Sequence, residues 1–168
     1  TTYLDLQAHN YKPQRSIDFY GQFYKGFYLA PIQIVNAKNP ILLKPNMEVM
    51  IVGLNYNHIY NSKQFSYAAA FNQTEWQKKS AGSPMLGVES YFTYFNDEDG
   101  LIPTELDKIF DSKMPKDYYN FKIGPTVGYA HTFVLKEHFY ATAAATAGLD
   151  INFSKEENMP TFLVDNFI

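Results

Sequence analysis

Residues 119–153 alternate between apolar side chains and small or polar side chains along two long runs, which a charged break at Lys136 and Glu137 separates. Successive side chains of a β-strand point to opposite faces, so this period of two predicts two strands joined by a hairpin. Because the break is short, we expect Lys136 and Glu137 to form a two-residue turn. In the first run one face carries Phe121, Ile123, Pro125, Val127, Tyr129, His131, Phe133 and Leu135, and the other carries Lys122, Gly124, Thr126, Gly128, Ala130 and Thr132.

Five earlier segments alternate in the same way and are also predicted strands: residues 3–10, 16–29, 49–60, 65–72 and 84–95. Short links at 11–14, 61–63 and 136–137 indicate antiparallel hairpins, because a parallel crossover needs about a dozen residues. The links 30–46, 73–83 and 96–118 are long, and the pattern that follows Pro103 predicts a short amphipathic helix over 103–110. The chain is therefore predicted to be all-β, an antiparallel up-and-down meander of seven strands.

Composition narrows the classes of protein to which the chain can belong. A length of 168 residues with 46% hydrophobic content suits one domain, residues 1–168. The net charge of -3, without a basic stripe, gives no reason to expect a nucleic-acid partner. Zero cysteines exclude disulfides, thiol catalysis and Cys-ligated metals, and no run of 18 apolar residues predicts a membrane-spanning helix. Aromatic residues make up 17% of the chain, which favours sheets and interfaces.

The face opposite the apolar one indicates whether the sheet surrounds a protein core or meets lipid. In a soluble sheet that face meets water and is rich in charge, whereas here it is mostly Gly, Ala, Thr, Ser, Asn and Tyr. Aromatic residues also bracket the apolar runs, Phe121 with Phe133 and Phe139 with Phe153, as in strands of outer-membrane barrels. We therefore expect a transmembrane β-barrel rather than a soluble one. Bacterial barrels have even strand numbers from eight upward, so a count of seven means that the barrel is incomplete or that a strand was not recognised. The irregular order of short and long links along the chain points to the same conclusion.

Few side chains suggest a site within these strands. We expect a polar network in the barrel lumen, made of Asp5, His9, Asp18, Glu89, Lys122 and Asp150. His131 and His138 lie in or beside the apolar phase, so interfacial positions are expected rather than metal ligation. The serines Ser80, Ser83 and Ser90 lie in no recognisable nucleophile motif. No catalytic residue, cofactor site or metal site is predicted.

The segment Gln73 to Ser83 is the strongest candidate for a specific contact. Trp76 has the amphipathic ring that anchors at a lipid headgroup boundary, and Lys78 and Lys79 suit lipid phosphates or an acidic partner. The alternative is a solvated loop with an ordinary interfacial tryptophan.

Several stretches resemble an uncharacterised family of Bacteroidota proteins, a domain of unknown function numbered four-four-two-one, thought to be outer-membrane β-barrels. These stretches are "LDLQAHNY", "FYGQFYKGFY", "GLNYNHIYNSKQFSYAAAFNQTEWQKKSAGS" and "FKIGPTVGYAHTFVLKEHFYATA", and the most specific piece is "SYAAAFNQTEWQKKSAGS", residues 66–83. The resemblance implies a bacterial outer-membrane location, a signal peptide and further strands on both sides of this chain, which would then be the middle portion of a longer barrel. The family implies no activity, so no catalytic residue is carried over.

These observations lead to one expected function and two alternatives. We expect a non-enzymatic outer-membrane barrel that acts as a structural or interaction subunit of a cell-envelope complex, with outer-membrane lipid and other outer-membrane or surface proteins as partners. The long apolar link "APIQIVNAKNPILL" favours such contacts. One alternative is a barrel that binds or transports a small ligand or lipid. The less favoured alternative is a lipid-modifying enzyme.

Overall fold

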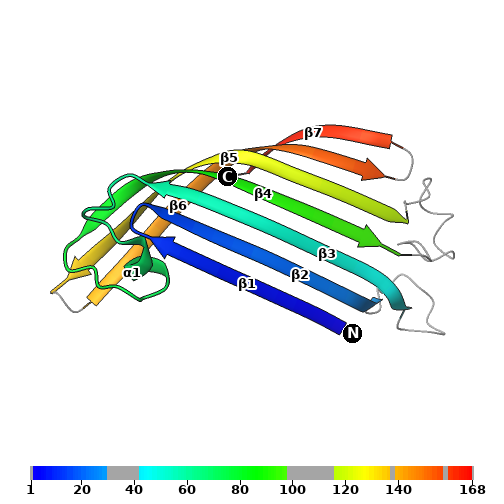
Figure 1. Cartoon of the computed structure of the whole chain (residues 1–168), viewed down its shortest axis with the longest axis horizontal. Helices are drawn as coiled ribbons and strands as arrows, with labels where there is room; N and C mark the ends of the chain where they lie inside the picture. The colour runs from blue at the N-terminus through cyan, green and yellow to red at the C-terminus, as the bar shows by residue number, and fades with distance from the viewer. Residues whose placement is uncertain (1, 30–41, 98–115, 137–138, 157–158, 168) are drawn as a thin grey trace.

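The computed structural model describes residues 2–29, 42–97, 116–136, 139–156 and 159–167. Its elements are β1 (Thr2–Lys12), β2 (Arg15–Leu29), β3 (Leu42–Ile59), α1 (Tyr67–Phe71), β4 (Ala81–Asn96), β5 (Asp117–Leu135), β6 (Phe139–Glu156) and β7 (Met159–Phe167) (Figure 1). Within the described ranges, no helix has the length and apolar character needed to cross a membrane.

All seven strands belong to one sheet whose spatial order, β1 to β7, is the order of the chain. Every neighbouring pair is antiparallel, and the β1–β2 ladder runs without a break from Thr2 opposite Lys25 to Lys12 opposite Arg15. The predicted all-β antiparallel meander is thus confirmed. Five of the strands are 15 to 19 residues long, which exceeds the roughly 9–11 residues that cross a bilayer.

The sheet arches along its length, so it has a convex and a concave face (Figure 1). We call the end that carries α1 the helix end, and the opposite end the far end. The helix end also carries the β1–β2 turn, residues 13–14, and the β5–β6 turn that begins at Lys136. The links at the far end, 30–41, 98–115 and 157–158, lie outside the described residues.

The predicted strand over 65–72 is wrong, because this segment forms α1. Ser66 caps the helix, with its hydroxyl oxygen accepting a hydrogen bond from the Ala69 N–H at 3.0 Å. A serine at this position satisfies a backbone donor that the first turn leaves unpaired, and the alanines that follow favour helix. Residues 60–80 are therefore one long connection between β3 and β4, and the predicted hairpin at 61–63 is absent from this described segment.

Other predicted boundaries also change. The strand β7 was not predicted, and β3 begins at Leu42, within a segment that was predicted to be a link. The predicted β5–β6 hairpin is confirmed, but its two-residue turn is wrong: Leu135 pairs with Phe139, so three residues connect the strands. The first of them, Lys136, has a positive φ of 52°. The predicted helix over 103–110 and His138 lie outside the described residues.

A small apolar core lies at the helix end, where the β3–β4 connection folds against the sheet. Phe65 and Ile59 are fully buried there, and Tyr67 and Ala70 of α1 pack against the cluster. The remaining members are Ala81, Met85 and Ala130. Most of the larger apolar side chains of the strands lie elsewhere, on the exposed convex face.

Candidate functional site

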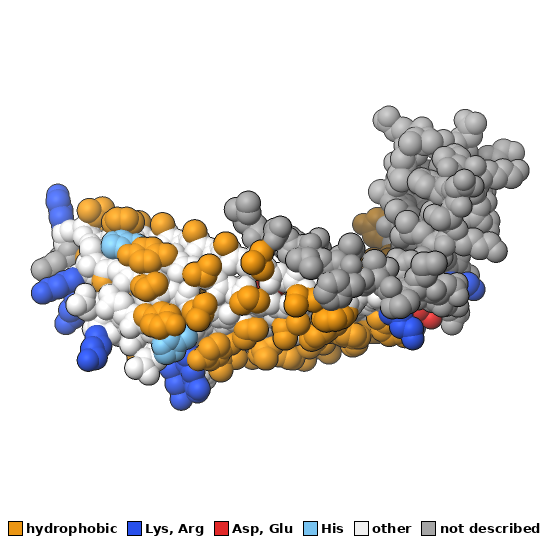
Figure 2. Space-filling view, turned by 90° about the horizontal axis from the view of Figure 1, so that it is seen from above, with side chains coloured by type: hydrophobic (Ala, Val, Ile, Leu, Met, Phe, Trp, Pro, Cys, Tyr) orange, Lys and Arg blue, Asp and Glu red, His pale blue; other side chains and the backbone are white. Residues whose placement is uncertain are grey.

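The convex face carries a broad band of exposed apolar side chains. Figure 2 shows this band along the length of the sheet, with basic side chains gathered at the helix end. The alternation in β1 to β6 places these residues on one face, as the sequence predicts. The band includes Leu4, Leu6, Phe19, Val52, Leu54, Leu86, Val88, Ile123, Val127, Leu149 and Ile151, all of which are exposed.

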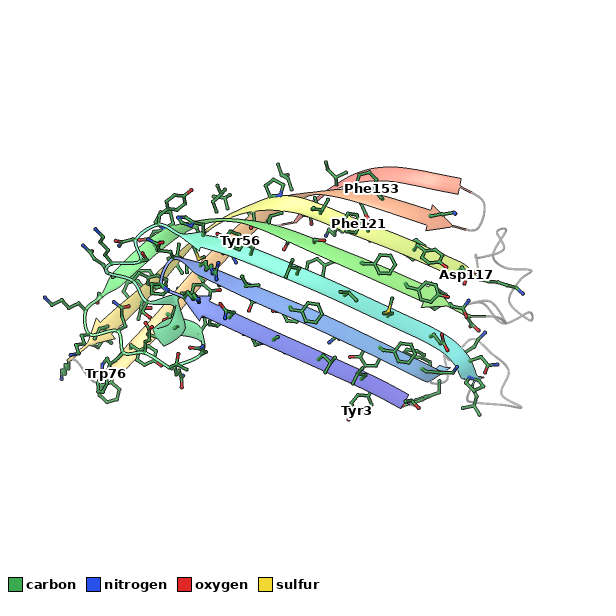
Figure 3. The ribbon with its side chains drawn as sticks, viewed as in Figure 1. Tyr3, Tyr56, Trp76, Asp117, Phe121 and Phe153 are labelled. Carbon is green, nitrogen blue, oxygen red and sulfur yellow. The ribbon has the colours of Figure 1, made fainter. Side chains whose placement is uncertain are left out.

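Aromatic rings gather near both ends of this band. Ring contacts include His131 with Phe133, whose centroids are 4.3 Å apart, and Phe121 with Phe153, at 6.3 Å (Figure 3). The helix-end belt consists of His58, Tyr60, Tyr129, His131 and Phe133, and the far-end belt of Tyr94, Tyr119, Phe121 and Phe153.

The separation of the two belts matches the apolar thickness of an outer membrane. Tyr119 and Tyr129 lie ten positions apart on β5, which is about 33 Å of strand at roughly 3.3 Å per residue. A tilt of about 40° projects this length to about 25 Å, the height of the apolar band of outer-membrane barrels. His131, for which an interfacial position is expected, lies in the helix-end belt.

The concave face holds the predicted polar residues in two clusters and one separate site. In the first cluster, the Asp18 carboxylate accepts a hydrogen bond from the Tyr11 hydroxyl at 2.8 Å and pairs with His9 Nδ1 at 2.6 Å. Asp5 lies on the same face of β1 as His9, but its carboxylate lies 3.4 Å from the amide nitrogens of Gln7 and Gln22 instead. The predicted network is thus divided, because Asp5 and His9 are four residues apart on β1, about 13 Å at roughly 3.3 Å per residue.

The second cluster contains Glu89, Lys122 and Asp150. Lys122 Nζ lies 2.9 Å from an Asp150 carboxylate oxygen, and the Glu89 and Asp150 carboxyl groups are within hydrogen-bonding reach of each other. Asp150 is 1% exposed and lies over Gly124, where a Cβ would approach its carboxylate oxygen to 2.2 Å. Gly124 therefore leaves the space that the carboxylate occupies. The β5–β6 ladder skips Gly124 and Pro125, and proline has no N–H to contribute.

Between these clusters the concave face encloses a hollow of about 530 Å³. The α1 residues Tyr67 and Phe71 form part of its wall, and the Tyr67 ring contacts that of Tyr11 with centroids 5.1 Å apart. Burial raises the pKa of the Tyr67 hydroxyl; the hydrogen bond to Ser16 opposes this rise and the nearby Asp18 carboxylate adds to it. The other lining residues are Asp18, Tyr20, Asn55, Asn57, Met85, Glu89, Lys122, Thr126, Ala144, Thr146 and Gly148.

Ser80 and Ser83, two of the three serines considered for catalysis, have structural partners. The Ser83 hydroxyl is buried, accepts the Asn61 N–H at 2.9 Å and donates to the Pro84 carbonyl at 2.8 Å. Ser80 Oγ accepts the Val134 N–H at 2.8 Å. Ser90 is half-buried and lies in β4. Within the described part of the chain, no group of three His, Cys, Asp or Glu residues is arranged to hold a metal ion.

The β3–β4 connection is built around Gln77, which the sequence gave no reason to single out. Its buried side-chain amide accepts the Ser66 N–H at 2.7 Å and donates to the carbonyls of Gln64 and Lys79, at 2.7 and 2.8 Å. These three bonds close residues 64–79 into a compact loop. This loop coincides with the stretch on which the resemblance to a known family is most specific.

The three predicted contact residues lie on this loop and face outward. Trp76 is 72% exposed, and Lys78 and Lys79 are exposed beside it (Figure 3). Trp76 borders a second hollow, of about 300 Å³, between the loop and the β5–β6 hairpin.

Two further contacts bring together residues that are distant in sequence. Lys44 Nζ and the Asp97 carboxylate form a buried ion pair at 3.0 Å at the far end. On the concave face the Tyr91 ring covers Gly53, its partner across β3 and β4, where a Cβ would meet the ring at 2.6 Å. Both pairings depend on strand register, which the sequence alone did not supply.

Comparison with curated proteins and with solved structures finds no match. One family profile, described as Domain of unknown function (DUF4421), matches residues 1–164, nearly the whole chain. The chain therefore belongs to the DUF4421 family.

Proposed function

We propose that this chain forms part of the wall of a transmembrane β-barrel in a bacterial outer membrane. The observation that carries the proposal is the convex apolar band, bounded by two aromatic belts about 25 Å apart. Charged side chains in the middle of the strands lie on the concave face, as Lys122 and Asp150 do. This distribution suits lipid outside and a small polar lumen inside.

A soluble protein with this surface would be unusual. Monomeric soluble proteins rarely expose contiguous apolar patches larger than a few hundred Å², whereas here exposed apolar residues extend over six neighbouring strands. Lipid is the environment in which such a surface needs no protein cover, and a closed barrel is the form in which a sheet satisfies its edge N–H and C=O groups there.

Within that membrane we propose a non-enzymatic role, as a structural or interaction subunit of a cell-envelope complex in Bacteroidota. The compact β3–β4 loop at the helix end, held by Gln77, presents a fixed surface with exposed Trp76. Partner proteins and outer-membrane lipid are the proposed contacts.

A second candidate function is the binding and transport of a small polar ligand through the barrel. The hollow of about 530 Å³ favours it, since its lining combines tyrosine rings with amide and carboxylate groups. Uptake of a labelled solute into vesicles that contain the protein would favour this alternative, and its retention outside would favour the structural role.

Two arginine substitutions on the convex face test the membrane proposal. Val88 lies opposite Pro125 near the middle of the band and is 42% exposed, whereas Leu135 lies at its helix-end edge and is 62% exposed. In a barrel, arginine costs about 2–4 kcal/mol at the midplane and about 0–1 kcal/mol near the interface. We therefore expect Val88→Arg to destabilise the protein in lipid vesicles, and Leu135→Arg, the matched control, to leave it nearly unchanged.

The measurement is the free energy of unfolding from vesicles by denaturant titration. If the protein is instead soluble, both exposed positions meet water and both substitutions have small effects. Equal costs for Val88→Arg and Leu135→Arg, or a fully folded protein without detergent or lipid, would sink the proposal.

A further inference from the structure

We infer that the hollow of about 530 Å³ on the concave face is a binding site for a small organic molecule that carries a primary ammonium group. The ammonium group would lie beside the Glu89 carboxylate, and the apolar body of the molecule would pack against the aromatic rings of β1 and α1. This inference rests on the second candidate function, the binding and transport of a small polar ligand, and names the chemical class of that ligand.

The hollow has the size of a ligand site and is closed at one end. Its volume lies within the range of about 300–1,000 Å³ that is usual for small-molecule pockets. Toward the helix end, Tyr67 and Phe71 of α1 line it, and the apolar core fills the concave face beyond them (Figure 1). The β6 part of the lining has only small side chains, Ala144, Thr146 and Gly148. A ligand would therefore enter from the far-end side of the lumen.

Aromatic rings form one wall of the hollow. The Tyr67 ring contacts the rings of Tyr11 and Phe71, with centroids 5.1 and 4.3 Å apart, and all three residues line the hollow. Hydrogen bonds fix two of the rings, because the Tyr11 hydroxyl donates to Asp18 at 2.8 Å and the Tyr67 hydroxyl bonds to Ser16. Such rings pack against apolar groups and attract a cation through their faces. This wall thus suits a cation with an apolar body.

The charge around the hollow favours a cation over an anion. Among the described residues of its lining, Asp18 and Glu89 are acidic and Lys122 is basic. Lys122 is already paired with the Asp150 carboxylate, at 2.9 Å. Even when His9, which lies 2.6 Å from Asp18, is protonated, the carboxyl groups of this set outnumber its cations. A cleft with an excess of negative charge raises the local concentration of cationic solutes.

Side-chain oxygens gather where the strands form the base of the hollow. Asn57, Gly87, Thr126 and Gly148 lie opposite one another across β3 to β6. A Cβ at Gly87 would clash with Asn57 Oδ1 and would lie 2.6 Å from Thr126 Oγ1. A Cβ at Gly148 would lie 3.4 Å from Glu89 Oε1. The two glycines therefore leave room for these three oxygens to approach one another over the sheet.

Two of these oxygens are acceptors that the protein itself does not use. Thr126 is 3% exposed, and among the described residues its hydroxyl has no hydrogen-bond partner. The Asn57 amide donates to Ser16 Oγ at 3.3 Å and to Asn55 Oδ1 at 3.0 Å, which turns its own oxygen toward Gly87. Buried polar groups are nearly always paired, so the lone Thr126 hydroxyl points to a group that a ligand supplies. A primary ammonium group has three N–H donors, which suits a base that offers three acceptors.

Binding of phenethylamine to the full chain in detergent micelles, measured by isothermal titration calorimetry, tests the inference. This probe joins a primary ammonium group to one aromatic ring, and phenethyl alcohol is its neutral counterpart of nearly the same size. Titrations into empty micelles are subtracted. We expect the amine to bind at least about 10-fold more tightly than the alcohol, because its hydrogen bonds are charge-assisted.

A matched pair of substitutions separates a site from the overall charge of the lumen. Glu89→Gln keeps the size of the side chain and removes its charge, so it should weaken amine binding by about 10-fold and leave alcohol binding nearly unchanged. Asp5→Asn is the control, since it removes a carboxylate from an exposed position of the concave face that does not line the hollow. We expect Asp5→Asn to bind the amine as the parent does.

Thr126→Val tests the unpartnered hydroxyl by two measurements. It should weaken amine binding by about 2- to 10-fold, the effect of losing one hydrogen bond. The urea midpoint of the ligand-free protein should stay the same or rise, because the hydroxyl has no partner to lose among the described residues. A lower midpoint together with unchanged amine binding would assign Thr126 a structural role and count against the site.

Three outcomes overturn the inference. They are equal affinities for the amine and the alcohol, amine binding by Glu89→Gln that equals that of the parent, and an equal loss in Glu89→Gln and Asp5→Asn. Each of them leaves the membrane proposal in place. Conversely, a chain that binds the amine and folds fully without detergent or lipid supports the site and refutes the membrane proposal, and binding without uptake into vesicles supports the site and refutes transport.

Discussion

Replacing Lys122 with methionine should destabilise the protein strongly, because its ammonium group neutralises the buried Asp150 carboxylate, beside which the half-buried Glu89 carboxyl group lies. Lys122 Nζ lies 2.9 Å from the Asp150 carboxylate, and Glu89 lies within hydrogen-bonding reach of Asp150. Methionine keeps most of the length of the side chain but none of its charge. The substitution therefore leaves two carboxyl groups together without a counter-charge.

The size of the stability loss on Lys122→Met follows from the burial of the Lys122–Asp150 ion pair. Asp150 is 1% exposed and the Lys122 side chain 18% exposed, so solvent screens their interaction little. Removing one partner of a buried ion pair costs about 3–5 kcal/mol. Since part of Lys122 reaches solvent, we expect a loss near 3 kcal/mol for Lys122→Met. The double change Lys122→Met with Asp150→Asn should cost less than Lys122→Met alone, because no paired carboxylate is then stranded.

Urea titration of the protein in detergent micelles, followed by tyrosine fluorescence or circular dichroism, measures these values. With a slope of about 1–3 kcal/mol per molar urea, a loss of about 3 kcal/mol moves the midpoint by about 1–3 M. Glu89→Gln is the control, expected within about 1 kcal/mol of the parent because the Lys122–Asp150 pair remains. A Lys122→Met midpoint equal to that of the parent, or a double variant no more stable than the single one, would refute the reasoning.

Two further predictions concern the β3–β4 connection. Gln77→Leu leaves three backbone groups without their partner, at about 1–3 kcal/mol for each buried group that stays unpaired, so trypsin should cleave at Lys78 and Lys79 faster than in the parent; an unchanged cleavage rate would contradict this. Burial raises the pKa of Tyr67 above its usual value near 10, so the folded state holds this proton more tightly and loses stability as pH rises from about 10 through the raised pKa. Tyr67→Phe removes that loss, so the stability of the parent relative to the variant should fall above about pH 10 in denaturant titrations; a constant difference would count against it.

The sequence was sufficient to predict the strands whose alternation of apolar and polar residues is visible locally. Each of β1, β2, β4, β5 and β6 alternates with period two between turn residues, and the structure places Lys122 and Asp150 on one face and Phe121 and Ile151 on the other, as predicted. Consecutive strands pair in a meander, so neighbours in sequence are neighbours in the sheet.

The predictions from sequence are wrong where contacts between residues distant in the chain outweigh the local pattern. Residues 65–72 alternate like a strand, yet Phe65 is buried against the sheet and Gln77, eleven residues beyond Ser66, ties the segment into a loop. The pairing of His9 with Asp18 rather than Asp5 depends on cross-strand register. In β7, Pro160 and the adjacent apolar pair Leu163 and Val164 interrupt alternation, so no strand was recognised.

The hydrogen bonds between the β3–β4 connection and the sheet limit where strands can change in length among members of this family. Inserting two residues in a strand keeps every later side chain on its original face. At the helix end, however, Asn61 bonds to Ser83 and Gly82, and Ser80 bonds to Val134, so an insertion there would shift one anchor relative to the others. We therefore expect paired insertions among relatives to accumulate toward the far end, while strand lengths at the helix end stay fixed.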